Sequence, residues 1–222
     1  MENSMVNYKN GKHVNQEEKV FILNLKAQEN LIIAQREKLV ANEFKKLAKN
    51  LLKKAKSRQN FVEKEIKLAN TRKTLVESNK QLLESRIKSK ELLKFSDELI
   101  RNEREFISYH DQVAQNQLEL ANYHKELAKL EKDLANKKIL LADSKIEVAD
   151  IYIRIGKLQL KYAKAIQNKS SQKILIIKGY YKEEQNKLSH KLKELAQKEE
   201  QVKSIQIDIV DLTSKLSQTL IK

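Results

Sequence analysis

The sequence predicts an all-α protein, an elongated antiparallel three-helix coiled-coil bundle of long helices with an alanine-rich heptad seam. Alanine recurs at every seventh position over two long stretches, and a third stretch repeats large apolar residues at the same interval. The 222 residues include no proline and three glycines, the two residue types that most often interrupt helices. A sustained seven-residue repeat keeps one residue type on one stripe of a helix and imposes a left-handed supercoil.

The first helix is predicted over residues 16–94, after a flexible polar tail at residues 1–15. Its seven-residue series, which we call the seam, is Ala27, Ala34, Ala41, Ala48, Ala55, Val62, Ala69, Val76 and Leu83. One position before the seam runs a companion stripe of large residues: Ile33, Val40, Leu47, Phe61, Leu68, Leu75 and Leu82. Small seam residues let helix axes approach to the short end of the usual ~8–10 Å range, and the companion stripe lies about 100° away. We therefore expect this helix to contact two neighbours, one at each stripe.

The second helix is predicted over residues 97–167, after a reversal near residues 94–98. The heptad register breaks between Leu83 and Leu93, and Ser96 and Asp97 are side chains that accept hydrogen bonds from free backbone N–H groups at a helix start. Its seam is Ala114, Ala121, Ala128, Ala135, Ala142, Ala149, Gly156 and Ala163. Its companion stripe is Leu120, Leu127, Leu134, Leu141, Val148, Ile155 and Tyr162. We expect this helix to contact two neighbours as well, with Gly156 giving a closer contact or a mild bend, and a hinge as the alternative.

The third helix is predicted over residues 172–221, after a polar segment at residues 167–171. Its large residues recur every seven positions: Ile174, Tyr181, Leu188, Leu195, Val202, Ile209 and Leu216. This helix is expected to cover the wide apolar face of the first two, completing a single helical domain over residues 16–222. Residues 174–181 are either an exposed apolar element for a partner or membrane, or the first turns of this helix packing under the end of the bundle; we favour packing.

Positive charge is concentrated in two parts of this basic chain, which has 45 Lys and Arg against 30 Asp and Glu. One part is the first helix, and the other is residues 151–180, with seven basic residues and no acidic one. The candidate anionic-surface site lies in the first part: Lys45, Lys46, Lys49, Lys53, Lys54, Lys56 and Arg58. Such lysines either solvate a long helix or bind a polyanion in a salt-sensitive manner.

Catalytic and metal-binding patterns are absent from the sequence, so we expect no enzymatic activity, cofactor, metal or small-molecule substrate. The four histidines are scattered, and His124 is interpreted as a partly buried packing residue rather than a ligand. No cysteine is present, and no apolar run has the length of a signal peptide or a membrane span. These observations favour a cytoplasmic protein, with membrane association as the alternative.

The repeat itself motivates the first functional hypothesis, a structural or scaffolding protein that acts through shape and docks protein partners, with a homodimer among them. The second hypothesis is a membrane-surface protein that binds anionic lipid through a basic end. Three long antiparallel helices with excess lysine resemble the layout of BAR domains, and that resemblance implies a dimer on a membrane. The third hypothesis is a non-specific nucleic-acid or polyanion binder, since no base-reading motif is present.

Overall fold

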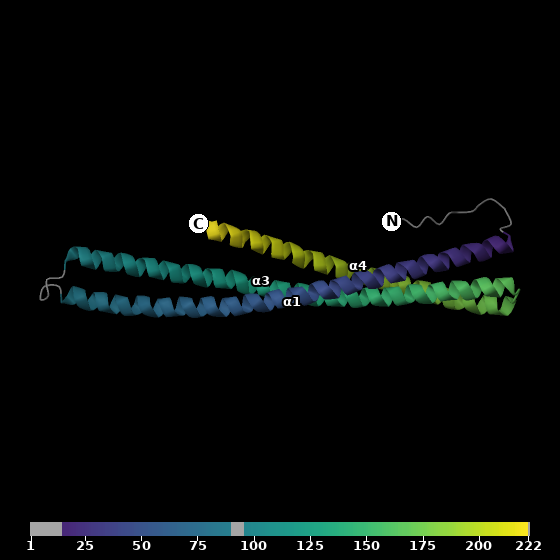
Figure 1. Cartoon of the computed structure of the whole chain (residues 1–222), viewed down its shortest axis with the longest axis horizontal. Coiled ribbons are helices and arrows are strands. Elements are labelled where there is room, and N and C mark those ends of the chain that lie inside the picture. Colours follow the sequence, from purple (N-terminus) through teal and green to yellow (C-terminus); the bar gives the residue numbers. More distant parts are fainter. Residues whose placement is uncertain (1–14, 90–95, 222) are drawn as a thin grey trace. The chain divides into compact units, whose positions relative to one another are not determined.

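The computed structural model describes residues 15–89 and 96–221, with side chains as far as residue 218. Three helices account for almost all of this part of the chain: α1 (Gln16–Lys88), α3 (Asp97–Gln167) and α4 (Ser171–Ile221), labelled in Figure 1. The described ranges contain no strand, and the predicted all-α three-helix bundle is confirmed. The predicted tail lies outside the described residues, apart from Asn15.

In the described part of the chain the first helix ends at Lys88, and the predicted extension to about residue 94 falls largely on residues 90–95, outside the described part. Leu83 is the last buried seam residue of α1, and it clusters with Ile100, the first buried residue of α3. The start of α3 is as predicted, because the Leu99 N–H donates to Ser96 Oγ at 3.2 Å, whereas the predicted reversal falls largely in residues 90–95, outside the described part.

The turn between α3 and α4 is a helix-terminating motif built around Lys169, which adopts a positive φ of 51°. The Lys169 N–H donates to the Ile166 carbonyl, and the Ser170 N–H donates to the Ala165 carbonyl, both at 3.0 Å. This pair of bonds is the Schellman arrangement, in which glycine usually occupies the left-handed position. The polar segment therefore ends one helix and begins the next, as the sequence predicts.

The chain divides into two compact units, and each helix contributes a segment to both. Unit 1 contains the described residues up to Lys45 together with Ile139–Glu199. Unit 2 contains the described residues of Lys46–Lys138 and of Glu200–Lys222. The expectation that residues 16–222 form one domain stays a prediction.

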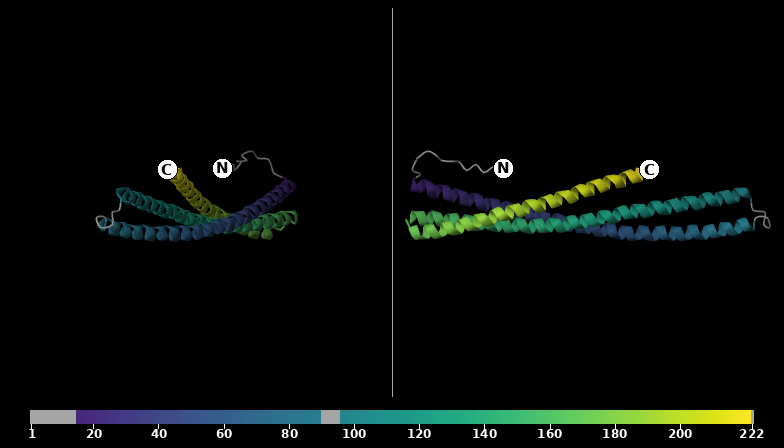
Figure 2. Two further views of the ribbon diagram at one scale, coloured as in Figure 1. Left: turned by 60° about the vertical axis from the view of Figure 1, so that its left-hand side comes forward. Right: turned by 180° about the vertical axis from the view of Figure 1, so that it is seen from behind.

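In unit 1, α3 contacts both other helices. Its contacts with α1 are antiparallel, since Asp150 pairs with Lys38 and Asp143 pairs with Lys45, each at 2.9 Å. On its other side α3 is joined to α4, where Arg154 pairs with Glu184 at 2.8 Å. Figures 1 and 2 show α3 and α4 side by side through this unit.

The alanine seam is the core of the contact between α1 and α3. All the predicted seam residues of both helices are buried, most of them completely. At Gly156 a Cβ atom would lie 3.1 Å from the Ala27 carbonyl oxygen of α1. The predicted close helix contact at Gly156 is therefore confirmed.

The companion stripes of α1 and α3 have different surroundings. On α3, Leu127, Leu134, Leu141, Val148 and Ile155 are 1–5% exposed, so the prediction that this helix contacts two neighbours is confirmed. The same prediction is wrong for α1, because most of its companion stripe is exposed. In unit 2 the α1 residues that are 40–49% exposed are Leu47, Phe61, Leu68, Leu75 and Leu82. The physical reason is that α4 packs on α3 and covers the α3 stripe.

The large heptad residues of α4 face inward as predicted. Leu195, Val202 and Leu216 are buried, and the other members of the series are half-buried. In unit 2, Lys137 of α3 donates to Gln201 of α4 at 3.0 Å. No helix in the described part of the chain has an apolar stretch long enough to cross a membrane.

Candidate anionic-surface sites

The predicted basic site on α1 divides into two groups. Lys45 pairs with Asp143 in unit 1, and Lys54 and Arg58 pair with Glu131 in unit 2. The other four members are exposed and have no acidic partner among the described residues: Lys46, Lys49, Lys53 and Lys56. Three of the seven predicted charges are thus compensated within the protein, and four remain available to an external anion.

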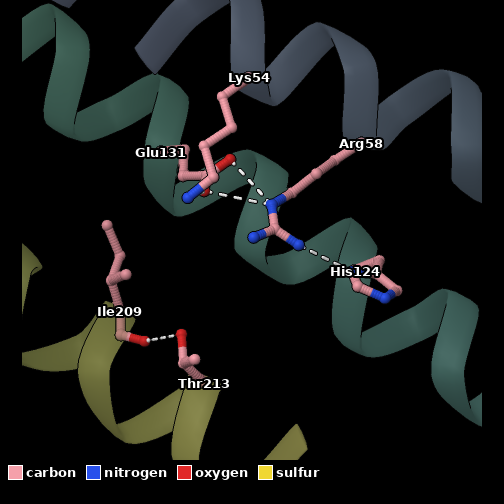
Figure 3. Close-up of polar contacts among 6 residues, drawn as sticks. All are labelled: Lys54, Arg58, His124, Glu131, Ile209 and Thr213. Carbon is pink, nitrogen blue, oxygen red and sulfur yellow. Dashed lines mark hydrogen bonds and ion pairs between the residues drawn. The ribbon is translucent and has the colours of Figure 1, made fainter. Parts of the chain in front are cut away.

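Glu131 is the centre of the compensated group, shown in Figure 3. Its side chain on α3 is buried, and both of its oxygens lie 3.1 Å from Arg58 Nε. Lys54 Nζ lies 2.9 Å from Oε1. A buried carboxylate needs such partners because its desolvation is costly, so Lys54 and Arg58 serve the contact between α1 and α3.

His124 extends the same cluster. Arg58 donates to His124 Nδ1 at 2.9 Å, and a guanidinium can only donate, so Nδ1 is the unprotonated acceptor of a neutral ring. Burial lowers the pKa of His124, and the nearby Arg58 charge lowers it further. The ring also meets Phe61 edge-on, with centroids 4.9 Å apart. These contacts agree with the interpretation of His124 as a packing residue.

The Arg58–Glu131 pair belongs to a series of polar contacts, which we call the polar ladder. Its members stand three positions after the seam on both α1 and α3 and join the two helices. The five pairs are Asn30–Gln159 and Glu37–Lys145 in unit 1, and Arg58–Glu131, Glu65–Gln117 and Arg86–Glu103 in unit 2. All ten side chains are buried or half-buried. The ladder places polar pairs beside the alanine seam in each unit.

The polar ladder can specify the helix register, which the seam cannot. An alanine series looks the same after a slip of one heptad, but a ladder residue would then meet a different partner. Lys145 Nζ, for example, lies 3.0 Å from Glu37 in the observed register, and a slip of one heptad toward the C-terminus of α1 would leave Lys145 between Phe44 and Leu51, without Glu37. Burial lowers the pKa of Lys145, but its hydrogen bonds to Glu37 and Glu199 leave it raised overall. Polar core residues fix register in this way in coiled coils.

The sequence reasoning missed the polar ladder, although its signal is present. Position 54 is a companion-stripe position where most other heptads of α1 carry a large apolar residue, and a lysine there indicates an acidic partner. The seven-residue spacing of His124, Glu131, Lys138 and Lys145 on α3 is a second signal. Both become visible when the polar residues, and not just the apolar ones, are sorted by heptad position.

The turn from α3 to α4 forms a second basic surface, within unit 1. Residues 157–182 include seven lysines: Lys157, Lys161, Lys164, Lys169, Lys173, Lys178 and Lys182. No acidic residue lies among them in the sequence, and all seven side chains are exposed. Within the described residues none of the seven has an acidic partner. This turn therefore carries uncompensated positive charge.

The first turns of α4 are apolar on two sides. Ile174, Ile177 and Tyr181 are half-buried, which agrees with the expected packing under the end of the bundle. Leu175 and Ile176, in contrast, point outward and are 74% and 52% exposed. The expected packing is thus observed on one side of this helix, and apolar side chains are exposed on the other.

Across the described ranges there is no group of three His, Cys, Asp or Glu side chains that could hold a metal ion. The chain also matches no protein-family model, no curated protein and no solved structure. The resemblance to BAR-domain layout accordingly stays an expectation.

Proposed function

We propose that this protein is a non-enzymatic coiled-coil scaffold that acts through its helix faces. The polar ladder is the observation that carries the proposal. In each unit its polar pairs join α1 to α3, and the ten side chains together favour one register of the two helices. A hairpin specified in this way presents its outer residues at fixed spacing, which is what a docking scaffold requires.

The partner that best fits the outer face of unit 2 is a second copy of the chain. The exposed companion stripe of α1 offers large apolar residues every seven positions, a pattern typical of a helix that packs against another helix. The α1 segment of unit 2, residues 46–88, has 13 basic and 4 acidic residues. Residues 97–122 of α3 have 2 basic and 6 acidic residues. If the α1 stripe of each copy docks along α3 of the other, each basic segment lies against an acidic one, with the two-fold symmetry usual in homodimers.

Sedimentation equilibrium tests this proposal. We expect the wild-type chain to dimerise at micromolar concentration and the double variant Leu75→Gln/Leu82→Gln to be monomeric with unchanged helix content. The matched control is Ile207→Gln/Val210→Gln, which alters two apolar residues of α4 in the same unit that are even more exposed, and should leave the dimer intact. A wild-type chain that stays monomeric at 100-fold higher concentration, or a control that dissociates as readily, would contradict self-docking through α1.

A further inference from the structure

The outward side of the α3–α4 turn combines two features that the packing of unit 1 does not require. Leu175, Ile176 and Tyr180 are all more than half exposed on the first turns of α4. Gly179 lies between them on the helix, and a Cβ atom there would have no neighbour within 4 Å. The inward side of the same turns already supplies the contacts with α3. The outward apolar residues are therefore largely open to solvent.

The lysines of the turn surround these apolar residues. On a helix with 100° per residue, Lys173 lies on one flank of Leu175 and Ile176, and Lys178 and Lys182 lie on the other. A shallow groove between α3 and α4 brings further lysines to the same place, since Lys161 and Lys164 line it together with Ile176. Long lysine side chains can extend their charged ends away from an apolar surface while their stems stay in contact with it.

Acidic residues near the turn do not cancel this charge. Glu184 is occupied by Arg154 and Lys187, and these partners hold its pKa below the usual value although partial burial works against them. Glu17 and Glu18 of α1 come close, because neighbouring Gln16 donates to the Ile166 carbonyl at 2.6 Å. Glu183, which follows Lys182, pairs with Lys187. The two remaining carboxylates against seven lysines leave the turn strongly basic.

We propose that the α3–α4 turn is a docking site for an anionic lipid bilayer. Leu175, Ile176 and Tyr180 enter the headgroup region, and the surrounding lysines bind lipid phosphates and carboxylates. Exposed apolar side chains framed by lysines are typical of helices that lie in a membrane interface. A nucleic acid would use the lysines but would leave Leu175 and Ile176 in water, so the bilayer fits the surface better.

Co-sedimentation with vesicles tests the site, using phosphatidylserine–phosphatidylcholine vesicles and pure phosphatidylcholine as the neutral control. We expect binding to the anionic vesicles alone, and weaker binding at higher salt. Lys161→Glu/Lys173→Glu/Lys178→Glu should lower the affinity by roughly a hundredfold or more. The matched variant Lys49→Glu/Lys53→Glu/Lys56→Glu makes the same change in net charge on α1 and should lower it far less. Equal losses in the two triple variants would overturn the proposal, because binding would then follow net charge alone.

The apolar residues are tested at constant charge. Leu175→Gln/Ile176→Gln should weaken vesicle binding by about tenfold or more. Gly179→Leu, whose Cβ atom would meet no neighbour within 4 Å, should strengthen it. Circular dichroism should show both variants as helical as the wild type, since all three positions are exposed. Unchanged binding in both variants, or tighter binding of a mixed-sequence DNA duplex than of the anionic vesicles, would replace the bilayer with a simple polyanion as the ligand.

Discussion

Helices α1 and α3 carry the same heptad pattern, a small seam residue preceded by a large companion residue, yet their companion stripes end in opposite environments. The stripe of α3 is buried from Leu127 to Ile155, whereas the stripe of α1 is largely exposed. The five buried polar or charged residues of the described chain, Glu131, Lys138, Ser144, Lys145 and Gln159, also lie on α3. A heptad pattern therefore predicts the width of a helix's apolar face, but it does not predict whether a third helix covers that face.

Truncating a large residue on each stripe should have the largest effect on stability. We expect Leu127→Ala, at a residue 1% exposed on α3, to lower the free energy of unfolding by about 3 kcal/mol, through lost burial and a cavity. Leu75→Ala on α1, in the same unit but 46% exposed, should cost less than about 1 kcal/mol. Urea unfolding followed by far-UV circular dichroism measures both. If the chain self-associates through α1, the Leu75 variant should be compared at a concentration where both proteins are monomeric.

Equal losses of unfolding free energy in the Leu127 and Leu75 variants would contradict the difference between the two stripes. They would show that the α1 stripe is as well covered in solution as the α3 stripe, whether by α4 or by a second chain.

The next effect concerns the buried charge of α3. Glu131→Gln keeps the shape of the side chain but removes the charge that compensates Arg58 and Lys54, and we expect the free energy of unfolding to fall by about 2 kcal/mol. Glu63→Gln on α1 is the matched control, since Glu63 is exposed, and should change stability by less than about 0.5 kcal/mol. A Glu131 variant as stable as this control would show that the buried ion pair contributes nothing to the contact between α1 and α3.

Much of the fold follows from the sequence because helix packing is encoded in local periodicity. The alanine series and the absence of proline predict the helices and their seams. Ser96 and Asp97 predict the start of α3. The sequence does not predict which companion stripe the third helix covers, because α4 has enough apolar residues to pack on either stripe. The choice of α3 depends on contacts distant in sequence, such as Arg154 with Glu184.

The candidate basic site was harder to predict than the fold. A lysine stripe on α1 can be counted from the sequence, but the compensation of Lys54 and Arg58 depends on Glu131, more than seventy residues away. The basic α3–α4 turn needs no such knowledge, since residues 157–182 include no acidic residue. Local charge composition is therefore a better guide to an available basic surface than helical spacing alone.

Two glycines inside helices test how closely α3 contacts its neighbour. Gly179→Ala on α4 should raise the free energy of unfolding by about 1 kcal/mol, because alanine favours the helix and nothing opposes the added methyl group. Gly156→Ala gains the same helix propensity but brings Cβ to 3.1 Å from the Ala27 carbonyl oxygen, so we expect no net stabilisation. Thermal unfolding of the two variants against the wild type provides the measurement. An equal gain at both positions would mean that α1 and α3 can separate slightly without cost.

The smallest effect should be a dependence of stability on pH that originates at His124. Its pKa in the folded protein is lowered by burial and by Arg58, against the opposing influence of Glu65 and Glu131, whereas the unfolded chain has the ordinary value of 6.5. As the pH falls below about 6.5, the unfolded state binds more protons than the folded state, so stability decreases until the lowered folded pKa is passed. His124→Gln removes the titrating imidazole. The difference in unfolding free energy between wild type and variant therefore reports the contribution of His124 without that of the carboxylates. A difference that stays constant from pH 7.5 to 5 would show that the ring is protonated as easily in the folded protein as in water. That outcome is incompatible with Nδ1 accepting a hydrogen bond from Arg58, and it would place the α1–α3 contact at this position open to solvent.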